Sequence, residues 1–397
     1  MERVTGAKRF DTIVVGAGPA GSSTAFRLAE AGASVLLLDR ASFPRDKPCG
    51  GGVTPRALEH VPVPIDSVVE HVATSVELRL GFKRAAVRGR GGPLAFMTQR
   101  RRLDALLVEC AAAAGAELRE GVKVTGVETA DGGVVVTAAG ERLHARTLVG
   151  ADGVNGVTAR ALGLGGNRSV DVALEGNVPK TKIDAARYDG RLLMELGTVP
   201  GGYGWVFPKG DHLNVGVGGD EREGPRLRAH LERLCEAHGL RLEELEEVRG
   251  YRLPHRAADS TLARGPALLA GDAAGLVDPL TGDGMFEAFL SARFAAEAVE
   301  ALLRAEAETL DEYGVRLSRR LAPHLWASWS FRAALDRFPR TAFTLAKGRL
   351  VWPVVEKLVT GEITDLGGAR GIVRAPLGAL TLLGRAAGNP GHAYKPA

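Results

Sequence analysis

The feature that most constrains this chain is a glycine motif directly after a short apolar segment near its start. Gly16, Gly18 and Gly21 form the pattern G-x-G-x-x-G, and residues 11–15 before them end in an unbroken apolar run. Such a run is typical of a strand that is buried on both faces. The first glycine permits a tight turn, the second lets a pyrophosphate approach the backbone N–H groups, and the third lets a helix pack closely on the strand. The segment therefore predicts a phosphate-binding turn.

A helix and a second buried strand are expected after this turn. The helix should begin near Ala20 and end at Gly32, because glycine suits the position that follows a helix. Residues 35–38 are apolar and lead to Asp39 and Arg40, with Asp39 18 residues after the last glycine of the motif. An acid at this distance is typical of ribose binding. The motif alone is also consistent with an ordinary turn, but strand, helix and acid together favour a dinucleotide whose phosphates lie at the helix N-terminus.

Composition limits the class of protein. The chain has 397 residues, 45% hydrophobic and 25% charged, which is enough for two or three domains. A net charge of +4 without an RNA- or DNA-binding motif argues against a nucleic-acid partner. Cys49, Cys110 and Cys235 are odd in number and far apart, which argues against a disulfide framework and a thiolate metal site. No metal is expected.

The segment after Arg40 is a loop rich in proline and glycine. Residues 43–52 contain two prolines and end in Gly50, Gly51 and Gly52, which exclude a helix or a strand. Three glycines let the backbone pass close to a flat ligand, although they are also consistent with a flexible connector. Cys49 precedes them and is either a buried bystander, as most free cysteines are, or a functional thiol.

An α/β pattern continues to about residue 163. The expected elements are short strands within 75–96, a helix over 105–115 that follows Arg100, strands over 117–127 and 134–137, and a hairpin turn at 131–133. A further buried strand over 147–149 runs into Asp152. That acid would lie at the carboxyl edge of a parallel sheet, where ligands bind.

Strands and turns dominate from about residue 164 to residue 219. Residues 203–208 are predicted to form a strand whose alternation places Tyr203, Trp205 and Phe207 on one face. A turn at 209–211 then returns the chain into a second strand. The three rings form either a packed core face or one wall of a binding site.

A second acid at a strand end and a second glycine loop follow. The apolar residues 267–270 should form a buried strand that runs into Asp272. Gly282, Gly284 and Met285 lie where a glycine loop opens a long, alanine-rich helix. The positive N-terminus of this helix would point at the same ligand.

The order of these motifs resembles that of the flavoprotein hydroxylase superfamily over most of residues 10–300. The shared motifs are the glycine turn, Arg100-x-x-Leu103-Asp104, Gly-Ala-Asp-Gly at 150–153 and Gly-Asp at 271–272. Within that superfamily, Lys-Pro-Cys-Gly-Gly-Gly at 47–52 resembles the geranylgeranyl reductase family. So does Tyr-x-Trp-x-Phe-Pro at 203–208, followed after seven residues by Gly-x-Gly at 216–218. One departure is Gly156, because the family usually carries a serine there.

This resemblance implies a fold and its division. The fold class is α/β: a Rossmann-like FAD-binding domain of the flavoprotein hydroxylase type, with an inserted antiparallel β-sheet substrate domain and a C-terminal helical region. The implied limits are 1–72, 98–163 and 255–310 for the FAD-binding domain, 73–97 and 164–254 for the substrate (catalytic) domain, and 311–397 for the helical region.

The resemblance also implies site residues. Asp39 would bind the adenosine ribose, Val124 the adenine through its backbone, and Arg100 and Asp272 the middle of FAD. The loops around Cys49 and Met285 would border the isoalloxazine ring. The full set implied to bind the cofactor is Gly16, Gly18, Ala20, Gly21, Asp39, Arg40, Cys49, Gly50, Gly52, Arg100, Val124, Asp152, Asp272, Gly282, Gly284 and Met285.

The implied reaction saturates isolated double bonds of a geranylgeranyl or polyprenyl chain with hydride from N5 of reduced flavin. Such an alkene has no carbonyl to polarise it, so both hydride and proton must be positioned. Cys49, Tyr203 and Trp205 are the expected catalytic residues. The thiol either donates a proton or acts as a nucleophile, and the two rings face the prenyl chain and exclude water. The substrate would be a prenyl lipid or a prenyl diphosphate, and NADPH or reduced ferredoxin would supply electrons.

Two other function classes remain. An FAD-dependent monooxygenase or halogenase would share the flavin loops, but the halogenase pattern Trp-x-Trp-x-Ile-Pro is not met, because Tyr203 and Phe207 replace its first and third defining residues. A non-catalytic flavin-binding sensor is the third class. Product mass separates them: a reductase adds two hydrogens per bond, a monooxygenase adds oxygen, and a sensor converts nothing.

The composition of residues 314–350 bears on location. This segment carries eight Arg or Lys and one acid, Asp336, interleaved with aromatic residues. It is consistent with a helical cap on the core, with an interfacial segment, or with both. Because the first nine residues hold no apolar stretch and no run of 18 apolar residues occurs, we expect a cytoplasmic protein, peripheral on the inner membrane face if the segment is interfacial.

Overall fold

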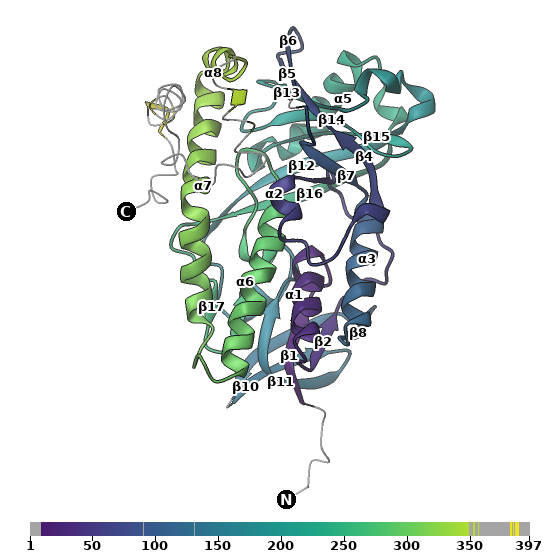
Figure 1. Cartoon of the computed structure of the whole chain (residues 1–397). Coiled ribbons are helices and arrows are strands. Elements are labelled where there is room, and N and C mark those ends of the chain that lie inside the picture. The colour runs from purple at the N-terminus through teal and green to yellow at the C-terminus, as the bar shows by residue number, and fades with distance from the viewer. Residues whose placement is uncertain are drawn as a thin grey trace, which may run out of the picture.

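The structure, a computed structural model, places two large sheets one above the other with long helices along one side (Figure 1). It describes residues 9–89, 91–130 and 132–348, together with residues 352, 353, 356, 382, 384 and 386–388. The expected α/β class with an inserted second sheet is confirmed.

The first sheet contains the predicted strand, turn and helix unit. Its strands are β1 (Arg9–Val15), β2 (Val35–Leu38), β8 (Glu117–Arg119), β9 (Val124–Ala130), β10 (Gly133–Ala138), β11 (Glu141–Gly150), β17 (Ala263–Arg264) and β18 (Ala267–Leu269). They run in the order β17-β18-β11-β1-β2-β8, with β10 paired with β11 and β9 paired with β10. The five strands from β18 to β8 pair in parallel. Their carboxyl ends therefore meet at one edge, where ligands bind in such sheets.

Helices cover this sheet and the second large sheet. Those of at least eight residues are α1 (Pro19–Glu30), α3 (Arg100–Ala113), α5 (Leu227–Ala237), α6 (Met285–Leu303), α7 (Asp311–Arg337) and α8 (Pro339–Ala346), and the single-turn helices are α2 (Pro55–Leu58) and α4 (Thr158–Ala161). The main apolar core joins α1, α3, α6 and α7, with Leu28, Leu107, Phe289 and Leu317 among its fully buried members. Helix α3 begins at Arg100 rather than at the predicted residue 105, because Arg100 pairs with Asp104 across its first turn, Nε to Oδ1 2.7 Å.

The glycine turn has the predicted form. Gly16 has a φ of +99°, and an added Cβ there would lie 2.3 Å from the carbonyl oxygen of Ala151. An added Cβ on Gly21 would lie 1.8 Å from the carbonyl oxygen of Gly16. Both glycines are thus required for the turn to pack against β11 and α1, before any ligand is considered.

The second sheet carries the aromatic strand. Its strands are β5 (Ser75–Leu80), β6 (Arg84–Gly89), β12 (Arg168–Pro179), β13 (Arg191–Leu196), β14 (Tyr203–Pro208), β15 (His212–Asp220) and β16 (Glu246–Arg256), in the order β16-β12-β15-β14-β13-β5-β6. The expected antiparallel pairing holds except between β13 and β5, which are parallel. The chain passes through the first sheet between these two strands, and such a long crossover permits parallel pairing.

A small third sheet anchors the glycine loop that follows Cys49. It consists of β3 (Gly52–Val53), β7 (Ala95–Thr98) and β4 (Val69–Ala73), in that order. The loop thus ends in a strand that pairs with β7, and Val53, Met97 and Ala73 are fully buried there. One end of the loop is therefore fixed.

The predicted C-terminal helical region is helical over its described part, α7 and α8, and most of residues 349–397 lie outside the described residues. Trp326 and Trp329 pack against the main core, and Phe343 is 1% exposed. These rings therefore form a cap on the protein. Across the ranges that the structure describes, no helix combines the length and apolarity needed to cross a bilayer.

Candidate active site

A cavity of about 310 Å³ lies between the carboxyl edge of the first sheet and one face of the second. Its walls bring together most of the predicted site residues from distant parts of the sequence. Those that line it are Gly18, Ala20, Cys49, Gly50, Gly52, Arg100, Tyr203, Trp205, Asp272, Gly282, Gly284 and Met285. The glycine turn, the cysteine loop and the aromatic strand thus share one site.

At one end of the cavity, two arginines face the start of α1. An added Cβ on Gly18 would have no backbone atom within 4 Å, and its nearest neighbours would be Nη2 of Arg45 at 3.8 Å and Nη2 of Arg100 at 3.9 Å. Arg100 is 6% exposed and donates two hydrogen bonds to Asp104, at 2.7 and 2.8 Å, and Arg45 contacts the same carboxylate at 2.9 Å. Burial alone would lower the pKa of Arg100, but Asp104 outweighs it and raises that pKa.

This end suits a pyrophosphate. The unpaired N–H groups of a helix start attract anions, and two guanidinium groups oriented by one buried carboxylate add positive charge beside them. Gly18 supplies the open space that a phosphate needs. The residues present therefore fit the phosphates of a dinucleotide cofactor.

Asp39 lies beside this turn, outside the cavity lining. Its carboxylate accepts hydrogen bonds from the N–H groups of Ala17, at 2.6 Å, and Ala41, at 2.8 Å. Each oxygen keeps a further lone pair for a ligand hydroxyl. Arg40 next to it is exposed, and Val124 is buried at the start of β9. Their expected roles in cofactor binding stay predictions.

The carboxylate of Asp152 was expected at the ligand, but it binds backbone N–H groups of its own chain segment. Ala151 and Gly153 line the cavity, whereas the carboxylate of Asp152 accepts hydrogen bonds from the N–H groups of Val157, at 2.7 Å, and Thr158, at 3.0 Å. It therefore caps α4 rather than facing the cavity, and a direct contact with the cofactor stays a prediction.

The absence of a side chain at Gly156 is explained by this cap. An added Cβ would lie 2.0 Å from Cγ of Asp152. We expect Gly156→Ala to lower the free energy of unfolding by about 1 to 3 kcal/mol, because the new methyl group displaces the capping carboxylate. Gly224→Ala is the control, since its nearest neighbour would be Val172 at 4.0 Å. Thermal unfolding measures both, and equal unfolding temperatures for the two variants would contradict this account.

The cysteine loop is held by two buried side chains. The N–H of Cys49 donates to Oε1 of Glu175 at 2.6 Å, and the N–H of Gly51 donates to Sγ of Cys49 at 3.3 Å. Lys209, 2% exposed, donates from Nζ to the carbonyl oxygen of Thr98 at 2.8 Å and to that of Gly50. Burial lowers the pKa of Lys209 to about 8. An added Cβ on Gly51 would lie 1.9 Å from this Nζ, so the triple glycine is a fitted loop, not a flexible connector.

The aromatic strand forms one wall of the cavity, which is one of the two arrangements expected for its rings. Ring centroids of Tyr203 and Trp205 lie 5.9 Å apart, and those of Trp205 and Phe207 lie 6.3 Å apart. In the pairing of β14 with β15, Trp205 lies opposite Gly216, where an added Cβ would lie 2.2 Å from the indole. The seven residues between Pro208 and Gly216 are three residues of turn and four of β15, and this spacing brings a glycine under the indole ring.

Each ring of the wall is held by a contact with a neighbouring segment. The indole Nε1 of Trp205 donates to Oδ1 of Asn214 at 2.7 Å, and the hydroxyl of Tyr203 donates to the carbonyl oxygen of Thr281. An added Cβ on Gly50 would lie 3.0 Å from the ring of Phe207, so the cysteine loop touches the wall. The cysteine loop, the aromatic wall and the loop at residue 281 thus position one another.

Asp272 is paired at the centre of the site. It accepts from Nζ of Lys47 at 3.1 Å and from the hydroxyl of Tyr251 at 2.8 Å. Burial alone would raise the pKa of Asp272, but Lys47 and Tyr251 outweigh it and lower that pKa. The side chain lies beside Gly284 at the start of α6. An ionised carboxylate is therefore held next to the second helix N-terminus.

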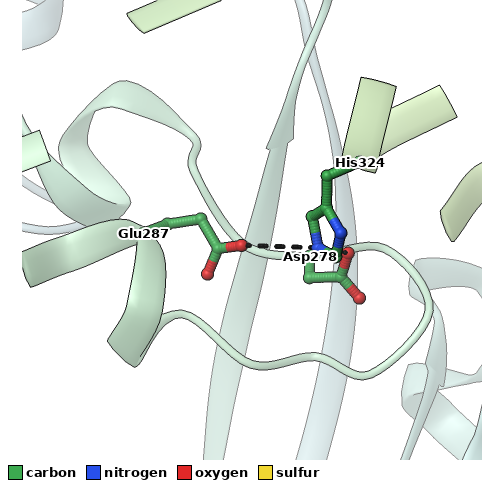
Figure 2. A group of neighbouring side chains, drawn as sticks. All are labelled: Asp278, Glu287 and His324. Carbon is green, nitrogen blue, oxygen red and sulfur yellow. Dashed lines mark ion pairs between the residues drawn. The ribbon is translucent and has the colours of Figure 1, made fainter. Parts of the chain in front are cut away.

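A buried charged cluster lies behind the loop that precedes α6 (Figure 2). His324 of α7 lies 3.1 Å from Oδ2 of Asp278 and 3.9 Å from Oε1 of Glu287, through its Nε2. These three side chains have metal-ligand types and spacing. Arg56 lies 3.2 Å from the same Nε2, however, and supplies a positive charge to the cluster.

This cluster shapes the loop rather than the cavity chemistry. Oδ1 of Asp278 accepts hydrogen bonds from the N–H groups of Leu280, at 3.1 Å, and Thr281, at 2.8 Å. Burial would raise the pKa of Asp278, but hydrogen bonds from His324 and Ser328 outweigh it and lower that pKa. We therefore assign the cluster to holding the loop that carries Gly282 and Gly284.

Sequence reasoning missed several residues of the site. The spacing of Arg100 and Asp104 could have indicated their helical pair. Glu175 and Lys209 gave no local signal, because their partners lie more than 100 residues away in the sequence.

Several known proteins resemble this chain in sequence. The sequence matches the FAD binding domain family over residues 9–324. It is 32% identical to the geranylgeranyl diphosphate reductase of Rhodobacter capsulatus, covering 75% of this chain and 76% of the relative. It is 34% identical to digeranylgeranylglycerophospholipid reductase 2 of Methanopyrus kandleri (74% and 78% covered) and 33% identical to the menaquinone reductase of Mycobacterium tuberculosis (79% and 83% covered). The chain belongs to the geranylgeranyl reductase family.

Solved structures agree on the fold. A geranylgeranyl bacteriochlorophyll reductase-like protein of Thermoplasma acidophilum superposes with a TM-score of 0.76 at 21% identity, covering 98% of both chains. The flavin-dependent brominase Bmp2 superposes with a TM-score of 0.73 at 17% identity, covering 96% of this chain and 100% of the brominase. At these identities both show the fold alone. Membership of the geranylgeranyl reductase family makes the protein an FAD-dependent oxidoreductase.

Proposed function

We propose that this protein is an FAD-dependent reductase that saturates isolated double bonds of a prenyl chain. The observation that carries the proposal is the single cavity that joins the phosphate end, the cysteine loop and the aromatic wall. Its middle is lined by Val76, Leu94, Leu192 and Met194 as well as by the rings, which suits an apolar chain. Bound flavin, once reduced, would supply the hydride.

The residues of this chain would bind, orient and shield the substrate. Tyr203 and Trp205 would hold the prenyl chain in the cavity and exclude water from the reacting double bond. Cys49 would lie at the reacting alkene, since its loop contacts the aromatic wall at Phe207. The phosphate end at Gly18 and Arg100 would hold the cofactor, and the loop around Gly282 and Met285 would border its ring.

The substrate class is part of the proposal. Three relatives are named for geranylgeranyl diphosphate, digeranylgeranylglycerophospholipid and menaquinone, all of which carry prenyl chains. We propose a prenyl lipid or prenyl diphosphate as substrate and NADPH or a reduced ferredoxin as electron donor. Mass spectrometry of prenyl lipids from the host with and without this protein tests the proposal. Loss of a species two mass units heavier per reduced bond supports it, and identical lipid profiles would count against it.

We also propose peripheral contact with the inner membrane face. Arg337 and Arg340 are exposed near the junction of α7 and α8, where they could meet anionic lipid. Phe331 and Phe343 are buried, and Trp326 and Trp329 pack against the main core, so the contact would be mainly electrostatic. Sedimentation with anionic vesicles, abolished by salt, would support it.

The effect of removing the Cys49 thiol follows from its position. We expect Cys49→Ala to keep bound FAD and its reduction, because the residue hydrogen-bonds to Glu175 and Gly51, while alkene saturation slows or stops before every bond is reduced. Single-turnover reoxidation of the reduced protein by a prenyl substrate measures this. Wild-type rates with full saturation in Cys49→Ala would leave the cysteine as a bystander.

A monooxygenase or halogenase is the alternative function. The shared fold with a brominase is the observation behind it. Tyr203 and Phe207, where the halogenase motif has Trp and Ile, argue against it.

A further inference from the structure

A second, smaller cavity lies behind the cysteine loop. Its volume is about 60 Å³, which is room for several water molecules. Its lining is almost entirely polar or charged, in contrast to the apolar middle of the large cavity: Asp46, Lys47, Cys49, Gln99, Arg100, Glu175, Asn177, Lys209, His212, Asn214, Glu247 and Arg249, with Pro48 and Gly176. Asp46, Glu247 and Arg249 are exposed, so the cavity borders solvent.

Glu175 of β12 forms part of the walls of both cavities. The side chain is 8% exposed, and its Oε1 accepts the N–H of Cys49 at 2.6 Å. Asn214 hydrogen-bonds to the same carboxylate and, through its Nδ2, donates to Asn177 at 3.1 Å. Asn177 donates in turn to the exposed Glu247 at 3.3 Å. A polar connection thus runs from the surface to Glu175, which binds the N–H of Cys49, the residue proposed to lie at the alkene.

No other acid that lines the large cavity also borders the small one. Asp171 is bound by Arg332 at 2.9 Å and by His255 at 2.8 Å, and Asp272 is bound by Lys47 at 3.1 Å. These partners outweigh burial and lower the pKa of both carboxylates, which disfavours the protonated form that a donor needs. Asp283 lies 4.0 Å from Arg56 in the charged cluster, and it borders only the large cavity.

We propose that Glu175 is the acid that protonates the alkene and that it is reloaded from solvent through the small polar cavity. The inference rests on the proposed function, in which reduced flavin supplies the hydride. The π bond breaks, one carbon takes the hydride, and the other forms a C–H bond with the proton of the Glu175 carboxyl. The resulting carboxylate takes a new proton from water in the small cavity, so charge and electrons balance. Cys49 would then position the alkene.

The groups around Glu175 shift its pKa in opposite directions. Burial raises the pKa of Glu175, while the N–H of Cys49, Lys209 and Arg100 lower it, and the net shift is upward. Arg249, its pairing partner on β16, is exposed to solvent. A raised pKa keeps a carboxyl protonated to higher pH, so the rate should fall as pH rises through that pKa.

Glu175→Gln tests the inference, because the amide oxygen still accepts the N–H of Cys49. The dithionite-reduced holoprotein is mixed anaerobically with geranylgeranyl diphosphate, and flavin reoxidation is followed against pH. We expect unchanged FAD content, a rate lower by about 100-fold or more, and loss of the pH dependence. Glu175→Asp should recover part of the rate together with its pH dependence. Infrared titration of the oxidised holoprotein should lose one protonated-carboxyl band in Glu175→Gln.

The matched control is Glu195→Gln. Glu195 is also a buried glutamate of the second sheet that accepts a backbone N–H, from Phe82 at 2.7 Å, and burial raises its pKa as well. It lies outside the cavity lining, so its variant should keep the wild-type rate and pH profile. Wild-type turnover with an unchanged rate and pH profile in Glu175→Gln would overturn this inference alone. Wild-type protein that converts no prenyl substrate would overturn the proposed function, and the inference with it.

Discussion

Gly18→Val should leave a folded protein that no longer binds FAD. The backbone of Gly18 is extended, with φ −75° and ψ −176°, which any residue adopts. A Cβ there would have ordinary contacts at 3.8 Å or more, with the ends of two arginine side chains only. The valine methyl groups would occupy the space between those guanidinium groups and the start of α1. We expect flavin occupancy below about one tenth, because the pyrophosphate can no longer approach the backbone N–H groups.

Two other glycines provide the controls for this prediction. Gly92→Val should keep full flavin occupancy, since no atom lies within 4 Å of the added Cβ. Gly21→Val should fail to fold, since its Cβ would lie 1.8 Å from the carbonyl oxygen of Gly16. Flavin absorbance per chain, with circular dichroism as the test of folding, measures all three variants. Full occupancy in a folded Gly18→Val protein would contradict the assignment of the phosphate end.

Trp205→Ala should lower kcat/KM most for long prenyl substrates. The indole is 7% exposed and forms the centre of the aromatic wall between Tyr203 and Phe207. Its removal takes away apolar contact worth roughly 2 to 3 kcal/mol, which corresponds to a loss of about 30- to 150-fold in kcat/KM. Flavin binding should be unchanged, because the side chains beside Gly18 at the phosphate end are those of Arg45 and Arg100, not the indole.

A conservative substitution separates wall area from hydrogen bonding. Trp205→Phe keeps most of the apolar area but cannot donate to Asn214. We expect it to retain most of the activity toward long chains. Steady-state kinetics with substrates of increasing prenyl length measure both variants. An equal loss in Trp205→Ala for the shortest and the longest chains would show that the indole does not contact the substrate chain.

The sequence predicted those parts of the site that local patterns encode. The glycine turn, α1, β2 and the alternation over Tyr203, Trp205 and Phe207 each follow from residues that lie close together in the chain. The resemblance to a known family then assigned Cys49, Arg100 and Asp272 to one ligand, and all three line one cavity.

The remaining features depend on contacts between distant segments. Lys209 seemed an ordinary turn residue, yet it is buried, and the carbonyl groups of Gly50 and of Thr98 at the end of β7 accept its hydrogen bonds. Asp152 seemed a ligand-facing acid, yet α4 begins close enough to use its carboxylate as a cap. Burial and orientation of this kind follow from the packing of whole sheets, which no short pattern describes.

Anaerobic single turnover with product mass tests the central claim most directly. Reduced holoprotein is mixed with geranylgeranyl diphosphate, a digeranylgeranyl glycerolipid or a menaquinone, and the product is weighed after the flavin reoxidises. We predict, for at least one of the three, a gain of two hydrogens per reduced bond and no requirement for oxygen. Products that contain added oxygen or halogen, formed only in air, would contradict the account.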